Sequence, residues 1–443
     1  MDSDNKRIHL YISTNEDNNA FVGVRIKSDR IDFHYPESYD IAGVDGQTEV
    51  KDIKMFRRDM IDILHTISLS KTRSFATQKT ENGVASTKNF AFMSYLWMIR
   101  DYMANGFYRN TEKIYRKNAK GKVNWKRTIA TQPIISKGNI IYNNLIVEVK
   151  NDTDTIITDA HRFCVYDSVR KAGWLFGINE KAFYVPSPTN SLLKKYISTV
   201  RTEIKNTFDD SKKQRLNHML KILSGVDDSK QVYEIVYGVD KYHYIYERMV
   251  DAIFGNIVDI KKYNPNASWF ILKGDSIFEE KEASSLRPDT IRIDPYPKTY
   301  LFDDTTKTAY VLDAKFYRYG TTGNREDLPE TTSVQKQITY ATHIKNNITK
   351  EEKIRDIHNA FVLPYNKNNN KFGLNNNLEY IGFSKANWVR ENADNDGVVH
   401  AFLIDMKHLI SSWSQGNCKD DIDKLIADID KYVEQHSNWI IVK

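Results

Sequence analysis

The sequence lacks the features that define several large protein classes. Two cysteines among 443 residues, Cys164 and Cys418, are too few for a disulfide framework or a cysteine-based zinc site. No stretch approaches the roughly 20 consecutive apolar residues that cross a bilayer. The opening residues, MDSDNKRIHLYIST, contain no apolar signal-peptide core. We therefore expect an intracellular, cytoplasmic protein without a membrane segment.

Several catalytic motifs are also missing. The chain contains no GxxxxGK[ST] phosphate loop, no GxSxG elbow and no CxxC pair. Its eleven histidines show neither HxxH nor HExxH spacing. We therefore expect neither nucleotide hydrolysis through a phosphate loop nor a zincin-type metalloprotease.

What is present is an ordinary globular composition with an uneven charge distribution. The residues are 40% hydrophobic, 28% charged and 12% aromatic, and a chain of this length predicts two or three domains. The net charge is +6, but residues 1–50 carry −5, residues 51–100 carry +5 and residues 101–150 carry +7. The positive charge is therefore concentrated between residues 51 and 150.

The densest basic segment is residues 112–127, EKIYRKNAKGKVNWKR, with seven basic residues and one acid. Such a cluster suits a phosphate backbone, because each neutralised phosphate releases counterions, and interleaved aromatic rings can stack on bases. A solvated basic loop and a docking surface for an acidic protein are the alternatives. The candidate DNA- or partner-binding residues are Lys113, Arg116, Lys117, Lys120, Lys122, Trp125, Lys126 and Arg127.

Hydrophobic periodicity and turn signals predict the organisation of the first half. Short β-like runs open the chain, and two helical patterns follow, the second ending at Asn105-Gly106. Strand-like runs at 139–149 predict a hairpin around Asn143-Asn144, and residues 190–224 predict a helical pair. The turn-forming run SGVDDSK then predicts a boundary. We expect an N-terminal DNA-binding or partner-docking region at 1–228 and a second domain at 229–443.

The second half alternates helices and strands. A helix is expected at 242–255 and another at 330–346, with strands in SWFILK, TIRID, AYVLDAKF, AFVLPY, LEYIGF and HAFLID. The almost continuous apolar run AYVLDAKF predicts a central strand. The expected fold class is α/β, with an α+β N-terminal region followed by a core whose mixed central sheet is flanked by helices.

The chemistry-bearing residues lie around two of these strands. Asp289 precedes TIRID, and Asp313 and Lys315 lie at the end of AYVLDAKF. Because strand side chains alternate, Asp313 and Lys315 share a face, and pairing of the two strands would bring Asp289 near Asp313. Carboxylates with waters and phosphate oxygens suit Mg²⁺, and a neighbouring lysine can orient or deprotonate water or stabilise phosphate charge. The alternative is an ion pair that caps a strand, since acid-x-lysine triplets recur in the chain.

Together these residues resemble a known family. Pro288-Asp289 followed by Asp313-Ala314-Lys315 is similar to the PD-(D/E)XK nuclease superfamily, with its mixed sheet flanked by helices. VLDAKFY with the downstream VQKQITYATHI resembles the LlaJI-type restriction endonucleases and the McrC-type nuclease subunits, and so does GKVNWKRTI at 121–129. The resemblance covers about residues 95–130 and 240–345.

The resemblance implies a metal site and a catalytic lysine. Asp289, Asp313 and the backbone carbonyl of Ala314 would bind Mg²⁺, with Mn²⁺ able to substitute, and Lys315 would be the catalytic lysine.

Three further residues match the family pattern to different degrees. Glu247 would support the metal, the alternative being a helix charge paired with Arg248. Gln337 would line the cleft as a further catalytic residue. Tyr340 lies three residues later, where the McrC-type pattern more often has four.

The resemblance also implies the function. We expect a Mg²⁺-dependent endonuclease that cleaves double-stranded DNA in a prokaryotic restriction or defence system. One such site cuts one strand, so a dimer or larger assembly is expected. The chain would act either within a sequence-specific LlaJI-type system or, as in the McrC-type arrangement, under a GTP-hydrolysing AAA+ ring. The alternative is a non-catalytic DNA-binding or GTPase-stimulating subunit with an inactive nuclease core.

Overall fold

The computed structural model consists of helices and strands in two compact units. It describes residues 7–14, 20–27, 30–41, 44–45, 49–50, 53–72, 92–137, 139–228, 235–257, 259–273, 276–282, 285–295, 307–389, 397–416 and 418–435. Within these ranges the fold is mixed α/β, with sheets flanked by helices, as the sequence predicted. None of the helices in this part of the chain is both long and apolar enough to cross a membrane.

The two units do not follow the expected division at residues 228/229. The arm unit consists chiefly of residues 86–235, and the core unit of residues 8–26, 30–85 and 236–443. The N-terminal strands and the first helix therefore belong with the C-terminal half. The reason is a long-range strand pairing that no local pattern in the sequence encodes.

The core unit is built on a five-stranded mixed sheet with the order β14-β15-β16-β18-β17. Its strands are β14 (Thr290–Pro295), β15 (Lys307–Ala314), β16 (Ile354–Tyr365), β18 (Val398–Asp405) and β17 (Leu378–Lys385). β15, β16 and β18 are parallel, whereas β14 and β17 run antiparallel at the edges. β15 is buried from Thr308 to Ala314, so AYVLDAKF forms an interior strand, as its apolar run predicted.

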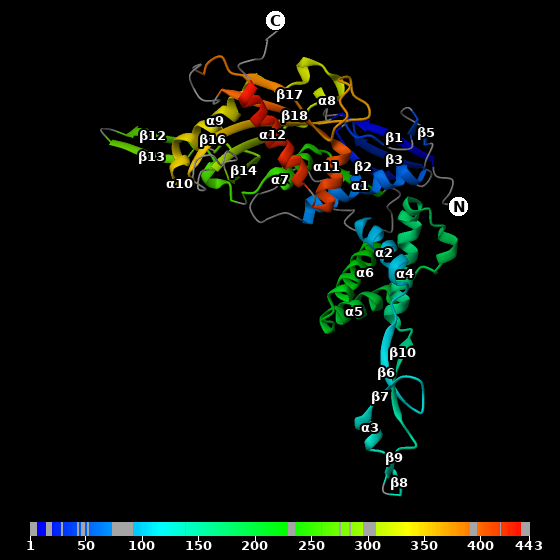
Figure 1. Cartoon of the computed structure of the whole chain (residues 1–443). Coiled ribbons are helices and arrows are strands. Elements are labelled where there is room, and N and C mark those ends of the chain that lie inside the picture. Colours follow the sequence, from blue (N-terminus) through cyan, green and yellow to red (C-terminus); the bar gives the residue numbers. More distant parts are fainter. Residues whose placement is uncertain are drawn as a thin grey trace. The chain divides into compact units, whose positions relative to one another are not determined.

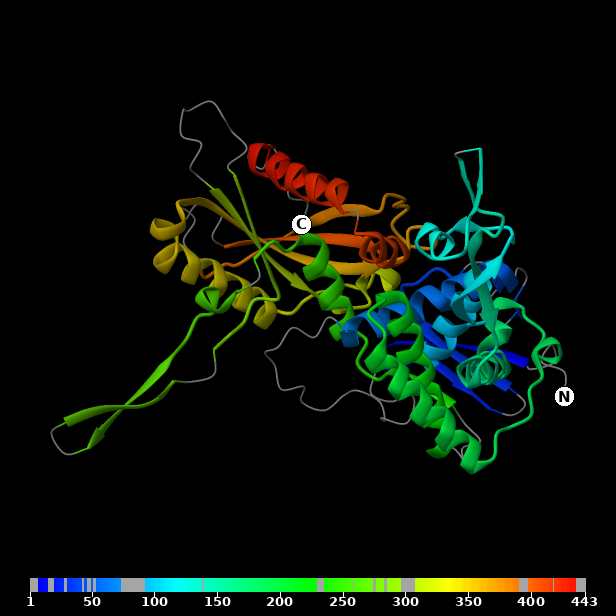
Figure 2. The ribbon, with the colours of Figure 1, turned by 90° about the horizontal axis from the view of Figure 1, so that it is seen from below.

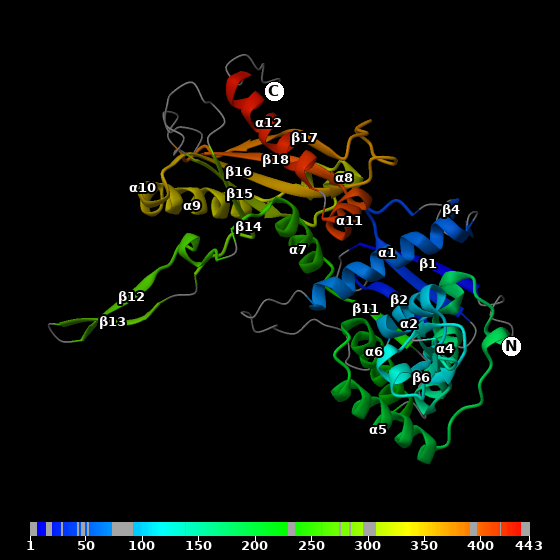
Figure 3. The ribbon, with the colours of Figure 1, turned by 60° about the horizontal axis from the view of Figure 1, so that its bottom comes forward.

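Helices cover both faces of this sheet (Figure 3). They are α7 (His243–Phe254), α9 (Thr331–Asn347) and α12 (Lys419–Gln435). Ile338 of α9 packs in one cluster with Leu403 of β18, whereas Tyr432 of α12 contacts His400 of the same strand, 4.9 Å between ring centroids. Residues three apart on a strand point to opposite faces, so α9 and α12 lie on opposite sides. The helix α7 contacts β14 and β15.

A smaller sheet, with the order β1-β3-β2-β11, completes the core unit. Its strands are β1 (Arg7–Ser13), β3 (Arg30–Pro36), β2 (Val22–Ile26) and β11 (Ile235–Val239). The helix α1 (Ile53–Thr72) packs Phe56 against Phe33 of this sheet, with 6.1 Å between the ring centroids, and α11 (Met406–Gln415) contacts α1 and β18. Gly23 adopts φ +149°, and a Cβ there would lie 2.2 Å from the Tyr237 carbonyl oxygen. Only glycine allows this approach of β11 to β2.

The arm unit combines helices with a projecting strand-rich arm (Figure 1). The helices are α2 (Phe92–Asn105), α4 (Ile156–Ala172), α5 (Asn190–Asn206) and α6 (Asp210–Asp228). The arm contains β6 (Asn110–Lys117), β7 (Lys122–Val123), α3 (Trp125–Ile129), β8 (Ile134–Ser136), β9 (Asn139–Ile141) and β10 (Ile146–Thr153). As predicted, α2 ends at Asn105, and Gly106 follows with φ +71°.

The hairpin predicted around Asn143-Asn144 is wrong. β9 pairs with β8, and β10 pairs with β6 and β7. The eight-residue register between β10 and β6 runs from Ile146↔Lys117 to Thr153↔Asn110. β6 covers one edge of β10 along its length and β7 takes part of the other edge, and the strand that precedes β10 pairs with residues 134–136 instead.

A separate hairpin extends from the core unit (Figure 2). It consists of β12 (Ser268–Lys273) and β13 (Ser276–Glu282) and ends just before residues 285–289. β12 and β13 pair only with each other among the strands of the described chain.

Candidate active site

Asp289 and Asp313 meet at one end of the β14–β15 pair. The antiparallel register joins Thr290 to Leu312, so the residue before β14 lies opposite Asp313. The Asp289 Oδ2 accepts a hydrogen bond from the backbone N–H of Ala314 at 3.3 Å. The sequence expectation that these two strands pair and bring the two acids together is confirmed.

The two carboxyls are crowded by further negative charge. Burial, a hydrogen bond with the Asp313 carboxyl and the charges of Asp313 and Glu247 raise the pKa of Asp289 well above its ordinary value, against the opposing charge of Lys315. Asp313 itself is buried at 6% exposure. Carboxylates so close together cannot both ionise without a positive partner.

Lys315 supplies one positive partner. Its Nζ lies 2.8 Å from Asp313 Oδ2, as the shared face of alternating strand residues predicted. Burial opposes the charge of this ammonium, but the charge and hydrogen bond of Asp313, together with the charges of Asp289 and Tyr317, raise the pKa of Lys315. The lysine is therefore held charged beside the paired acids.

Glu247 contributes a third carboxyl from α7. Burial and the charge of Asp313 raise the pKa of Glu247 to about 7, while Lys315 and Arg248 oppose the shift. The structure therefore brings Glu247 into the electrostatic field of the other two acids. The charge of Arg248 also acts on this half-buried carboxyl.

The helix α9 brings two polar side chains to the sheet. Gln337 has no exposed surface, and among the described residues neither its Nε2 nor its Oε1 has a hydrogen-bond partner. Tyr340 donates its hydroxyl hydrogen to the Arg287 carbonyl at 3.0 Å, just before Pro288-Asp289. Burial and the charges of Asp313 and Asp289 raise the pKa of Tyr340.

The donor set suits a hard divalent cation that keeps part of its water shell. Within the described residues, no group of three or more His, Cys, Asp or Glu side chains is placed to hold a metal ion by itself. Two carboxylates and a backbone carbonyl nevertheless match the partial protein shell that Mg²⁺ accepts alongside waters and phosphate oxygens. The raised pKa of Asp289 identifies excess negative charge that a cation would compensate.

Seven of the candidate binding residues of the arm unit are exposed. Lys113 lies in β6, opposite Lys150 of β10. The remaining candidates have exposed side chains: Arg116, Lys117, Lys120, Lys122, Trp125, Lys126 and Arg127. The Arg127 guanidinium lies 3.7 Å from the centroid of the Tyr115 ring, so the predicted interleaving of cations and aromatic rings exists in space.

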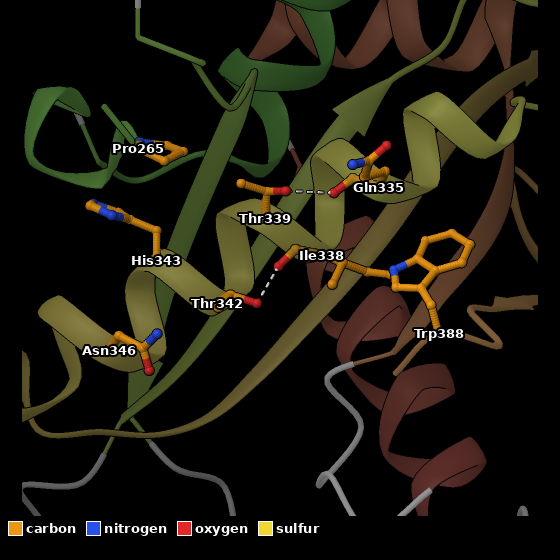
Figure 4. Close-up of a pocket in the computed structure, with 8 residues that line it drawn as sticks. All are labelled: Pro265, Gln335, Ile338, Thr339, Thr342, His343, Asn346 and Trp388. Carbon is orange, nitrogen blue, oxygen red and sulfur yellow. Dashed lines mark hydrogen bonds between the residues drawn. The ribbon is translucent and has the colours of Figure 1, made fainter. Parts of the chain in front are cut away.

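A cavity of about 340 Å³ lies beside α9 (Figure 4). Its lining includes Gln335, Thr339, His343 and Trp388 but no carboxylate. His343 Nε2 lies 3.2 Å from the Lys262 carbonyl oxygen, which gives this histidine a structural contact. The cavity is therefore a feature separate from the paired acids.

Sequence reasoning missed the contacts made near the Lys315 backbone and by the segment that follows it. The Tyr246 hydroxyl donates to the Val362 carbonyl, and Arg318 forms an ion pair with Glu37. Tyr246 adjoins the predicted Glu247, which is the one available signal. Nothing in the sequence connects residues 37 and 318, since 281 positions separate them.

A mixed sheet with paired acids and a lysine at the end of an interior strand defines a nuclease of the restriction-endonuclease-like class. The family model of the LlaJI restriction endonuclease matches residues 21–406, and the chain belongs to this family. It is thus a nuclease of a restriction or defence system. No curated protein matches the chain.

Two solved structures from Thermococcus gammatolerans are more distantly similar. One is the half-complex of a tetradecameric assembly of McrB AAA+ hexamers with bound McrC, at 12% identity and a TM-score of 0.35, covering 90% of this chain and 83% of that chain. The other is the McrBC complex, at 13% identity and a TM-score of 0.22, covering 52% and 64%. Scores this low do not establish a shared fold.

Proposed function

We propose that this nuclease is a Mg²⁺-dependent DNA endonuclease with its active site at the carboxyl end of β15. Asp289, Asp313 and the Ala314 carbonyl bind the metal, and Glu247 supports it. The observation that carries the proposal is the Lys315 Nζ held 2.8 Å from Asp313 Oδ2, beside an Asp289 that is bonded to the backbone of Ala314.

The side chains have separate roles in this reaction. When bound, the cation stabilises negative charge on the scissile phosphate and lowers the pKa of water. The Lys315 ammonium, kept charged by Asp313, orients the attacking water and stabilises charge on the phosphate oxygens. The attacking water releases a proton to solvent as its oxygen bonds to phosphorus, the bond to the 3′-oxygen breaks, and that oxygen takes up a proton. The products carry 5′-phosphate and 3′-hydroxyl ends.

The arm binds either DNA or a partner protein in this proposal. Its exposed basic residues suit phosphates. Its tip, however, presents four exposed isoleucines, Ile134, Ile135, Ile140 and Ile141, which a phosphate backbone does not require. This observation favours a role in docking on a protein, such as the AAA+ GTPase of the McrC-type arrangement. Separately, because one site cuts one strand, a dimer or larger assembly would cut both strands of the duplex.

Plasmid cleavage by the purified chain tests the proposal. We expect cleavage with Mg²⁺, loss with EDTA and loss in Asp313→Ala. Glu203→Ala is the matched control, because Glu203 belongs to an acid-x-lysine triplet in α5 of the arm unit. A second readout is thermal stability, which Mg²⁺ should raise in the wild type but not in Asp313→Ala.

The outcomes separate the arrangements. Cleavage by the chain alone indicates a self-sufficient nuclease. Cleavage that requires an added AAA+ partner and GTP indicates the McrC-type arrangement. Undiminished cleavage by Asp313→Ala would show that the assigned site is wrong.

A further inference from the structure

The segment from Lys315 to Arg318 leaves the end of β15 and decides where the Lys315 side chain lies. The Lys315 backbone N–H donates to the Val362 carbonyl at 2.9 Å, and the Tyr246 hydroxyl donates to the same oxygen at 3.1 Å. β15 ends at Ala314, so the contacts of residues 316–318 hold the segment beyond that point.

Phe316 fixes the segment against α7. Its ring centroid lies 5.3 Å from that of Tyr246 and 5.9 Å from that of Tyr242. Both tyrosines are fully buried, and the Tyr242 hydroxyl lies 3.0 Å from the Thr66 hydroxyl of α1. Packed aromatic side chains of this kind leave little freedom for the backbone that carries them.

Arg318 fixes the other end of the segment on the N-terminal strands. Its Nε lies 2.7 Å from Glu37 Oε2, and its second guanidinium nitrogen donates to Glu37 Oε1 at 2.9 Å. Two parallel hydrogen bonds set the orientation of the guanidinium as well as its distance. Glu37 is only 20% exposed and Arg318 37%, so the pair is partly shielded from water.

Glu37 is itself held in place. Its backbone N–H donates to the Ser13 carbonyl at 3.1 Å, and the Tyr39 N–H donates to the Pro36 carbonyl at 3.0 Å. The turn after β3 is therefore tied to the end of β1 and offers a fixed carboxylate to Arg318.

We infer that Glu37 and Arg318 are positioning residues for Lys315, through which the N-terminal strands hold the lysine beside Asp313. The inference rests on the proposed function, since it assumes that Lys315 takes part in cleavage. It makes the turn after β3 a working part of the nuclease rather than of a separate recognition region.

The core unit offers a matched control pair. Lys407 Nζ lies 2.9 Å from Asp59 Oδ2 and joins α11 to α1. Lys407 is 36% exposed, close to the 37% of Arg318, and Asp59 is 4% exposed, so its carboxylate is more deeply buried than that of Glu37. This second pair also links the N-terminal and C-terminal parts of the chain, but it does not involve the segment that carries Lys315.

The experiment compares Glu37→Gln with Asp59→Asn in the full-length protein. We expect Glu37→Gln to lower kcat about tenfold with KM within about twofold, because small misplacements of a catalytic group cost one to two orders of magnitude. Asp59→Asn should leave kcat within about twofold of the wild type, even if it lowers the melting temperature by as much as Glu37→Gln does. The double exchange Glu37→Arg with Arg318→Glu should recover most of the lost kcat.

Amine labelling of Lys315, followed by mass spectrometry, provides a readout that does not need activity. Glu37→Gln should speed the labelling several-fold, and Asp59→Asn should not.

If Glu37→Gln and Asp59→Asn lose kcat equally, in proportion to their losses of melting temperature, Glu37 only stabilises the fold. If Arg318→Lys raises KM while Glu37→Gln changes neither kcat nor KM, Arg318 contacts DNA and does not position Lys315. A wild type no more active than Asp313→Ala, both alone and with an added AAA+ partner and GTP, refutes the proposed function, and the labelling rates then decide the inference by themselves.

Discussion

The core unit and the arm unit use charge in opposite ways. In the core unit, Asp289, Asp313 and Glu247 are brought together under partial or full burial, with Lys315 as their cation. In the arm, the basic side chains from Arg116 to Arg127 are exposed. Removing a charge from water costs folding free energy, whereas an exposed charge costs almost none.

This difference explains why the buried charges of the core unit indicate a function more specifically than the exposed charges of the arm. Burying like charges together costs folding free energy, and active sites are where such perturbed acids cluster, so the paired acids point to chemistry. An exposed basic surface is compatible with DNA, with an acidic protein or with solvent alone. The four experiments that follow, ordered from the largest expected effect to the smallest, test this contrast.

Asp313→Asn should have the largest effect. It removes a proposed metal ligand and the partner of the Lys315 ammonium. Since a bound divalent cation supplies several kcal/mol of transition-state stabilisation, we expect cleavage to fall by about 10³-fold or more. Single-turnover cleavage of a labelled duplex measures the loss. DNA binding through the arm should persist, and a joint loss of binding would weaken the contrast between the units.

Neutralising the arm should have the next largest effect, on binding. The variant replaces four exposed lysines by alanine: Lys117, Lys120, Lys122 and Lys126. If all four contact phosphates, the slope of log affinity against log salt should fall by about 3.6. Titrations at several salt concentrations measure it, and the melting temperature should stay within about one degree.

A control of equal charge comes from the helices of the same unit. It replaces four other exposed lysines, Lys194, Lys195, Lys205 and Lys213. An identical salt slope in both variants would mean that binding follows overall charge. If the arm variant leaves the slope of log affinity against log salt unchanged, the arm does not contact DNA phosphates, and a protein partner is favoured.

Gln337→Met should separate stability from activity. Gln337 is fully buried, and neither of its amide atoms has a partner within the described residues. A buried unpaired polar group costs about 1–3 kcal/mol, so the apolar replacement of similar shape should raise the free energy of unfolding by about 1 kcal/mol. Cleavage should fall about tenfold if the amide contacts DNA or its water.

Urea denaturation and cleavage of the same preparations test this prediction. Gln335→Met is the control, because Gln335 is exposed on the same helix and should change neither quantity. A loss of stability in Gln337→Met would indicate a polar partner that the amide needs.

Ile135→Ser combined with Ile140→Ser should have the smallest effect on the isolated chain. The two side chains are 76% and 64% exposed at the arm tip, so the free energy of unfolding should change by less than about 0.5 kcal/mol. Pull-down or calorimetry with an AAA+ partner should reveal weakened binding. Full partner binding by this variant would exclude the tip as the docking element.

The sequence contained most of the candidate site because its signals are local. Asp313 and Lys315 follow a buried strand two residues apart, and Asp289 precedes the neighbouring strand. Alternation along a strand then predicts their shared face. Glu247 and Gln337 came from family resemblance, and the structure brings Glu247 into the field of the same acids.

The remainder depends on contacts between distant residues. The pairing of β2 with β11, and of Arg318 with Glu37, joins parts of the chain that share no local pattern. The hairpin at Asn143-Asn144 failed for a related reason: turn residues predict a bend, but the competing strands β6 and β7 take the edges of β10.

The pairing of β2 with β11 also has a consequence for synthesis of the protein. Until residues 235–239 leave the ribosome, the edge of β2 lacks the strand that covers it in the finished sheet. At roughly 5–20 residues per second, the intervening chain of about 200 residues leaves that edge open for on the order of 10–40 s. An open edge is a template for pairing with other chains. Translation speed and chaperone supply during this interval should therefore decide how much nuclease a cell obtains.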